Sequence, residues 1–92
     1  MKKFVVFYEA ADDMATKAPP VYPAHVAWVH EFRDRGTLLM LGTFGDPQQE
    51  GSMSVFSTLE AAESFAKGDP MVVQGVVKKW VLREWNETLG EI

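Results

Sequence analysis

Residues 3–8 carry apolar side chains on both alternating faces, and this pattern constrains the fold more than any other feature of the chain. In an extended conformation, one face holds Phe4, Val6 and Tyr8, and the other holds Val5 and Phe7. Hydrophobic side chains on both faces are typical of a strand that is covered from both sides. We therefore expect this stretch to form a central strand of a sheet.

Two helices are predicted from apolar spacing and capping signals. An apolar stripe at helical spacing covers residues 23–35, and Gly36 would end that helix. A second helix would begin at the capping box formed by Ser57 and Glu60 and would end at Gly68.

Three further strands complete the predicted elements, over residues 37–44, 52–57 and 76–85. Residues 45–51 would form a hairpin loop, and Asp69 with Pro70 would cap a short extra helix. Residues 9–20 are rich in Ala, Asp and Pro and predict a long loop, of the kind that often covers a binding site.

The resulting βαββαβ order predicts an α+β fold, the ferredoxin-like split βαβ, with a four-stranded antiparallel sheet and both helices on one face. The other face of the sheet would be bare, although residues 3–8 and 76–85 carry apolar side chains on both sides. Two such sheets stacked face to face would cover this surface. We therefore expect a single domain over residues 1–92 that forms a homodimer through its open sheet face, a dimeric α/β barrel.

Composition excludes several classes of function. The 92 residues include no cysteine and only two histidines, so a zinc site is not expected, and no cofactor-binding motif is present. The net charge of −4 and the lack of any basic cluster larger than Lys78 and Lys79 argue against nucleic-acid partners. The apolar run near the N-terminus is too short for a signal peptide or a membrane span. A cytoplasmic protein without a membrane partner is the simplest interpretation.

His25 stands out because it lies within the apolar stripe of the first helix. At about 100° per residue, His25 shares its face with Val29 and Phe32, whereas His30 points to the opposite side and is expected on the surface. A buried imidazole needs a hydrogen-bond partner, and it is also the commonest general base. His25 is therefore either a satisfied structural histidine or a functional one.

The predicted fold supplies a partner for His25. The first helix and the end of the second pack on the same sheet face, so the turn that carries Asp69 can reach the first turn of the first helix. Asp69 could equally be a simple helix cap. Tyr8, Tyr22, Trp28 and Thr43 are the residues that the fold could place beside this pair to bind a small-molecule ligand, although a tryptophan such as Trp28 is more often a core residue.

Three segments resemble the YciI-like, or YCII-related, protein family. They are Tyr22-Pro23-Ala24-His25, the stretch from Gly36 to Gly42, and the stretch from Ala66 through Asp69 to Gly75. The resemblance implies a dimeric ferredoxin-like fold and a His-Asp active site at His25 and Asp69. Family members often have Arg directly before Pro-Ala-His, and here that position is Tyr22, so the resemblance does not extend to an anion-binding arginine.

These observations predict a small cofactor-independent acid-base enzyme of lyase, isomerase or dehydrochlorinase type. Asp69 would orient His25, and His25 would transfer a proton. The alternative is a non-catalytic domain that binds a small molecule in the same pocket.

Overall fold

The structure, a computed structural model, describes all 92 residues. Its elements follow one another as β1 (Lys2–Ala10), α1 (Met14–Asp34), β2 (Leu38–Thr43), α2 (Pro47–Glu50), β3 (Ser52–Phe56), α3 (Leu59–Gly68), α4 (Pro70–Val73), β4 (Val77–Asn86) and a final 3-10 turn (Leu89–Glu91).

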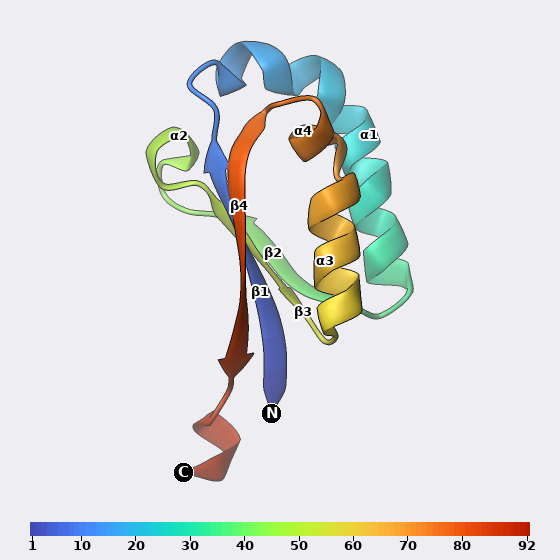
Figure 1. Cartoon of the computed structure of the whole chain (residues 1–92), viewed down its shortest axis with the longest axis vertical. Helices are drawn as coiled ribbons and strands as arrows, with labels where there is room; N and C mark the ends of the chain where they lie inside the picture. Colours follow the sequence, from blue (N-terminus) through green and yellow to red (C-terminus); the bar gives the residue numbers. More distant parts are fainter.

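The four strands form one antiparallel sheet in the order β2-β3-β1-β4. The two long helices, α1 and α3, both lie on one face of this sheet, as Figure 1 shows. The predicted ferredoxin-like α+β fold is therefore confirmed. As predicted, β1 is a central strand, since it pairs with β3 on one side and β4 on the other.

The predicted loop over residues 9–20 is largely wrong, because α1 begins at Met14, nine residues before the predicted start at Pro23. Pro19, Pro20 and Pro23 lie inside the helix. Proline removes a backbone donor and leaves a carbonyl without its helical partner. All three prolines are exposed, so water can reach the carbonyl groups on that side of the helix.

Two smaller predictions are also corrected. The expected hairpin loop at residues 45–51 contains the short helix α2, whose N-cap, Asp46, accepts a hydrogen bond from the Gln49 backbone. The cap of α3 is Thr58 rather than Ser57, and its hydroxyl accepts a hydrogen bond from the Ala61 backbone N–H at 3.1 Å. The helix therefore begins one residue later than the capping box suggested.

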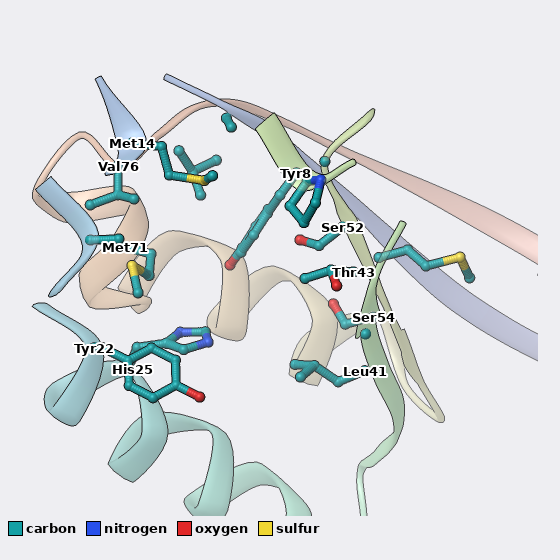
Figure 2. Close-up of a pocket in the computed structure, with 17 residues that line it drawn as sticks. Tyr8, Met14, Tyr22, His25, Leu41, Thr43, Ser52, Ser54, Met71 and Val76 are labelled. Carbon is teal, nitrogen blue, oxygen red and sulfur yellow. The ribbon is translucent and has the colours of Figure 1, made fainter. Parts of the chain in front are cut away.

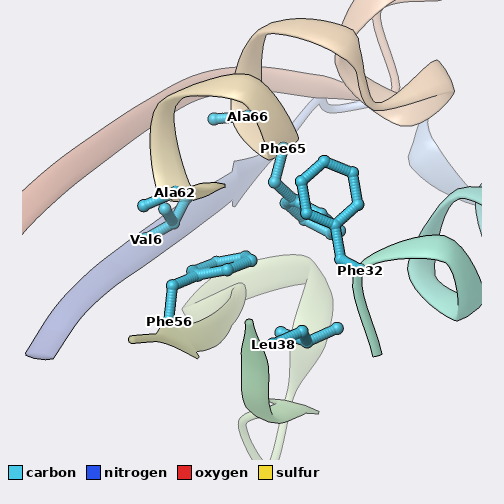
Figure 3. Packing of buried hydrophobic residues seen from close by; sticks show 7 residues of the cluster. All are labelled: Val6, Phe32, Leu38, Phe56, Ala62, Phe65 and Ala66. Atoms are coloured by element: carbon cyan, nitrogen blue, oxygen red, sulfur yellow. The ribbon is translucent and has the colours of Figure 1, made fainter. Parts of the chain in front are cut away.

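The core fills the space between the sheet, the C-terminal end of α1 and the inner side of α3 (Figure 3). Three phenylalanine rings meet there, with the Phe32 and Phe65 centroids 5.2 Å apart in an edge-to-face arrangement and the Phe56 and Phe65 centroids 5.0 Å apart. The other members of the cluster are Val6, Leu38, Ala62 and Ala66. Aromatic pairs of this kind contribute about 0.5–1.5 kcal/mol each beyond their buried area, so they fix α1 and α3 firmly on the sheet.

Neither of the two long helices, α1 and α3, covers the opposite face of the sheet in Figure 1. The cross-strand pairs Phe7–Met53 and Phe7–Val81 alternate with the inward pairs and so lie on this face. Met40 and Trp85 are 70% and 49% exposed. Apolar side chains thus gather on the open face, where the same register also places Lys3 and Arg83. No helix of the protein combines the length and hydropathy needed to cross a membrane.

Candidate active site

Asp69 occupies the sharp turn where α3 ends and α4 begins. Its backbone N–H donates to the Phe65 carbonyl at the end of α3, and its side chain accepts a hydrogen bond from the Met71 N–H of α4 at 3.0 Å. Pro70 is the first residue of α4, where a missing N–H costs nothing. Asp69 is completely buried, so its carboxylate depends on hydrogen bonds from its neighbours.

Two side chains complete that set of hydrogen bonds. His25 Nδ1 lies 2.8 Å from Asp69 Oδ1, and the Tyr8 hydroxyl donates to Asp69 Oδ2 at 2.8 Å. These residues come from α1 and β1, so the contacts join three parts of the chain that are distant in sequence. The structure brings His25 and Asp69 together at the distance that a His-Asp pair requires.

The carboxylate determines which ring nitrogen of His25 carries the proton. An ionised carboxylate can only accept hydrogen bonds, so Nδ1 must be the donor in this contact. In the neutral ring, Nε2 is then left with a free lone pair. Nε2 has no hydrogen bond within the chain. Every fully buried polar side-chain atom does have a hydrogen-bond partner, so Nε2 must be accessible. His25 lines the cavity described below.

Tyr8 is held in its neutral form. Burial, followed by the negative charge of Asp69 and the hydrogen bond to it, raises the pKa of the Tyr8 phenol far above its ordinary value. The phenol therefore remains a hydrogen-bond donor to Asp69 throughout the neutral range.

A cavity of about 340 Å³ lies beside this group of residues, at the small end of the range for ligand pockets. Figure 2 shows Tyr22 and His25 on one side of the cavity and side chains from β2 and β3, including Thr43, on the other. The remaining labelled lining residues are Tyr8, Met14, Leu41, Ser52, Ser54, Met71 and Val76.

The sheet forms one wall of the cavity, its floor, and the strand register determines which side chains lie there. Tyr8 pairs with Ser52, and Ser52 pairs with Thr43, so three hydroxyl side chains stand in one row across β1, β3 and β2. Ser54 lies in the adjacent row on the same face. Farther along β3 this face carries Phe56, which the helices cover. The cavity therefore occupies the part of the sheet where small polar side chains replace the phenylalanines.

The other predicted ligand contacts divide between the cavity and the core. Tyr22 and Thr43 line the cavity, as Tyr8 does. Trp28 does not line it, because its ring packs against Phe32 with centroids 5.0 Å apart and its Nε1 donates to the Phe65 carbonyl at 3.1 Å. Trp28 thus joins α1 to α3. No group of three or more acidic or histidine side chains is arranged to hold a metal ion.

Several lining residues were not among the predicted site residues. Met14 and Ala18 lie on the stretch that was expected to be a loop. The spacings from Met14 to Ala18, Tyr22 and His25 are four, four and three residues, which places all four side chains on one face of a helix. That periodicity could have revealed them. Ser52 and Ser54 lie four and two positions before Phe56, on the same face of the strand, and could have been identified as inward-facing polar residues.

Comparison with known proteins identifies relatives in sequence. The model of the YCII-related domain family matches residues 1–86. Protein YciI of Escherichia coli is 32% identical over 83 residues, which cover 79% of this chain and 85% of that protein, and the same values hold for protein YciI of Shigella flexneri.

Solved structures share the fold at lower identity. A 5-chloro-2-hydroxyhydroquinone dehydrochlorinase from Burkholderia phenoliruptrix, solved in complex with 2,5-dihydroxybenzoquinone, superposes with a TM-score of 0.68 at 17% identity, covering 92% of this chain and 94% of that one. A dimeric protein of unknown function with a ferredoxin-like fold from Bacteroides fragilis gives 0.53 at 13% identity, covering 94% and 95%. The family match over nearly the whole chain, together with the shared fold, shows that this chain belongs to the YCII-related family.

Proposed function

We propose that this protein is a small acid-base enzyme in which His25 transfers a proton to or from a small molecule bound in the cavity. One observation carries the proposal. His25 donates through Nδ1 to a buried carboxylate, while its Nε2 is accessible in a cavity of ligand size. This arrangement leaves one nitrogen free to exchange a proton and gives the other nitrogen a fixed partner.

The proposed reaction cycle needs no group beyond these side chains. His25 Nε2 takes a proton from a C–H or O–H of the substrate, and the electron pair left behind forms a double bond as a leaving group departs or a bond shifts. The imidazolium is stabilised by the Asp69 carboxylate 2.8 Å away. His25 then returns the proton to another substrate atom or to water. A positioned base of this type contributes a factor of about 10² to 10⁴ in rate.

Tyr8 is proposed to position Asp69 rather than to bind an oxyanion. Its single hydroxyl hydrogen is donated to Asp69 Oδ2 at 2.8 Å, so it is not available to a ligand. The Met71 N–H holds the other oxygen. With both oxygens occupied, the carboxylate keeps one orientation toward His25.

The functional unit is proposed to be a homodimer that forms through the open sheet face. That face exposes Met40 and Trp85 and carries Phe7, Met53 and Val81 on adjacent strands. Contiguous apolar patches of this kind are rare on soluble monomers. A sheet-on-sheet contact would cover these side chains.

A substrate screen with matched histidine variants tests the catalytic role. Neutral carbonyl compounds, lactones and chlorinated hydroxyhydroquinones are incubated in D₂O, and proton NMR follows exchange, isomerisation and elimination. The wild type should turn over at least one class, and His25→Gln should lower that rate about 10²- to 10⁴-fold. His30→Gln, at an exposed histidine of the same helix, should retain the wild-type rate.

Two outcomes would contradict the enzyme proposal. Equal rates for the wild type and His25→Gln would exclude His25 as the base. Binding in the cavity with no turnover of any class would instead favour the second candidate, a small-molecule-binding domain. The apolar character of most of the cavity lining is compatible with that alternative.

A further inference from the structure

The cavity lining carries no permanently charged side chain. None of its residues is Lys, Arg, Asp or Glu. Two lysines on bordering elements pair with carboxylates outside the lining: Lys17 of α1 pairs with Asp13 at 3.3 Å, and Lys78 of β4 pairs with Glu9 and Asp12 at 3.6 Å. A charged ligand would therefore find no opposite charge on the walls.

Asp69 makes the cavity especially unfavourable for anions. Its carboxylate is completely buried behind His25 and Tyr8, and both of these residues line the cavity. An anion inside would lose its hydration and would also lie near this buried negative charge, with only His25 to offset it. Tyr22, at the cavity edge, offers a hydroxyl but no cation.

The hydroxyl groups of the floor provide recognition of a different kind. Ser54 is only 4% exposed, and no side-chain hydrogen bond within the chain uses its hydroxyl. Every fully buried polar side-chain atom of the protein has a hydrogen-bond partner, so the Ser54 oxygen, which has none, must be partly accessible. Ser54 lines the cavity. Ser52 and Thr43 line the cavity next to it. A hydroxyl both donates and accepts, so this floor suits neutral hydroxyl and carbonyl oxygens.

We infer that the cavity selects an uncharged, compact molecule with a hydroxyl or carbonyl oxygen. Its oxygen binds the hydroxyl floor formed by Thr43, Ser52 and Ser54. Its apolar part packs against the methionines on the opposite side, Met14 and Met71. The inference deepens the proposed function, because it names the ligand class of the site in which His25 would act.

Three probes of nearly equal size and shape test this selectivity: 4-hydroxybenzyl alcohol, 4-hydroxybenzoate and 4-hydroxybenzylamine, which at neutral pH are neutral, anionic and cationic. Binding is followed by titration in ¹H–¹⁵N NMR spectra of the wild type. The alcohol should bind at least about tenfold more tightly than either ion. Its shifts should centre on the amides of Ser52, Ser54 and His25.

Two pairs of variants test which residues determine the selectivity for the uncharged probe. Ser54→Ala should weaken binding of the alcohol about two- to tenfold, whereas Ser57→Ala, at an exposed serine outside the cavity, should not. Tyr22→Arg adds a cation at a side chain that is 58% exposed, so the fold should tolerate it. It should strengthen binding of 4-hydroxybenzoate by about tenfold or more, while Tyr22→Phe should not.

The inference is overturned if 4-hydroxybenzoate binds the wild-type cavity as tightly as the alcohol, if the alcohol binds elsewhere, or if none of the probes binds saturably. These readouts measure binding alone. Failure of the proton-transfer proposal would instead appear as equal turnover in the wild type and His25→Gln, so the two failures can be distinguished.

Discussion

Tyr8 and Asp69 are 61 residues apart in the sequence, yet the Tyr8 hydroxyl donates to Asp69 Oδ2 at 2.8 Å. The contact joins the central strand β1 to the turn between α3 and α4. Asp69 binds His25 through its other oxygen, so one buried carboxylate connects the sheet to both helices. The proposed catalytic pair is therefore part of the packing that stabilises the fold.

Tyr8→Phe should destabilise the protein at neutral pH. The substitution keeps the ring but leaves Asp69 Oδ2 buried without its donor, which costs about 1–3 kcal/mol. Urea unfolding followed by circular dichroism measures the loss. An unchanged free energy of unfolding would show that the hydrogen bond contributes nothing net.

Tyr8→Phe should also change how the free energy of unfolding depends on pH in the alkaline range. The folded protein keeps the Tyr8 phenol neutral because its pKa is raised, whereas the unfolded chain releases that proton above about pH 10. The contribution of the Tyr8 phenol to the free energy of unfolding is therefore complete below about pH 10. It is lost as the pH rises further, by about 1.4 kcal/mol per pH unit. Urea unfolding between about pH 9 and pH 11 should show a steeper decline in the wild type than in Tyr8→Phe. If the free energy of unfolding declines equally in both proteins, the raised pKa of Tyr8 does not contribute to stability.

Asp69→Asn should keep the Nδ1–H tautomer of His25 while removing the negative charge beside it. The Met71 N–H and His25 Nδ1 both face Asp69 Oδ1, so the amide oxygen should take that position and accept from both, and the NH₂ group should face the Tyr8 oxygen. Long-range ¹H–¹⁵N spectra of the neutral ring distinguish the two tautomers. The His30 signals serve as an internal control, because that side chain is exposed. A proton that moves to Nε2 in the variant would contradict this orientation of the amide.

The arrangement of strands was predictable because each strand carries its own alternating pattern. β1 and β4 have apolar residues on both faces, and their predicted ranges differ from the observed ones by at most two residues at either end. The order of elements then leaves few topologies, and the ferredoxin-like one brings the start of the first helix near the end of the second. For this reason the sequence alone indicates Asp69 as a partner for His25.

The cavity was harder to predict because its walls depend on tertiary contacts. Pro19 and Pro20 suggested a loop, since local propensity alone disfavours proline inside a helix. In the folded chain, the contacts of α1 with α4 and β2 override that preference, and the face with Met14, Ala18 and Tyr22 lines the cavity. Likewise, no local signal shows that the Tyr8 hydroxyl binds Asp69 rather than a ligand.

Gly51 and Gly36 form a matched pair for testing how the sheet holds Tyr8. Both have a positive φ, +78° and +79°, so an alanine is disfavoured at either position. A Cβ at Gly36 meets nothing within 4 Å, but a Cβ at Gly51 would lie 1.9 Å from the Tyr8 carbonyl oxygen. Gly51→Ala should therefore cost at least about 1–3 kcal/mol more than Gly36→Ala. Urea unfolding of both variants measures the difference, and equal costs would contradict the close approach.

Met40→Lys tests whether the open sheet face forms the proposed dimer. Met40 is 70% exposed in the single chain, so a lysine there should leave the folded monomer nearly as stable as before. In a sheet-on-sheet dimer the same lysine would be buried without a partner and should shift the protein to monomers. Val73→Lys is the control, since Val73 is 64% exposed on α4, on the helical side of the sheet. Light scattering at micromolar concentration should give a dimer mass for the wild type and Val73→Lys and a monomer mass for Met40→Lys, and a monomeric wild type would exclude the dimer.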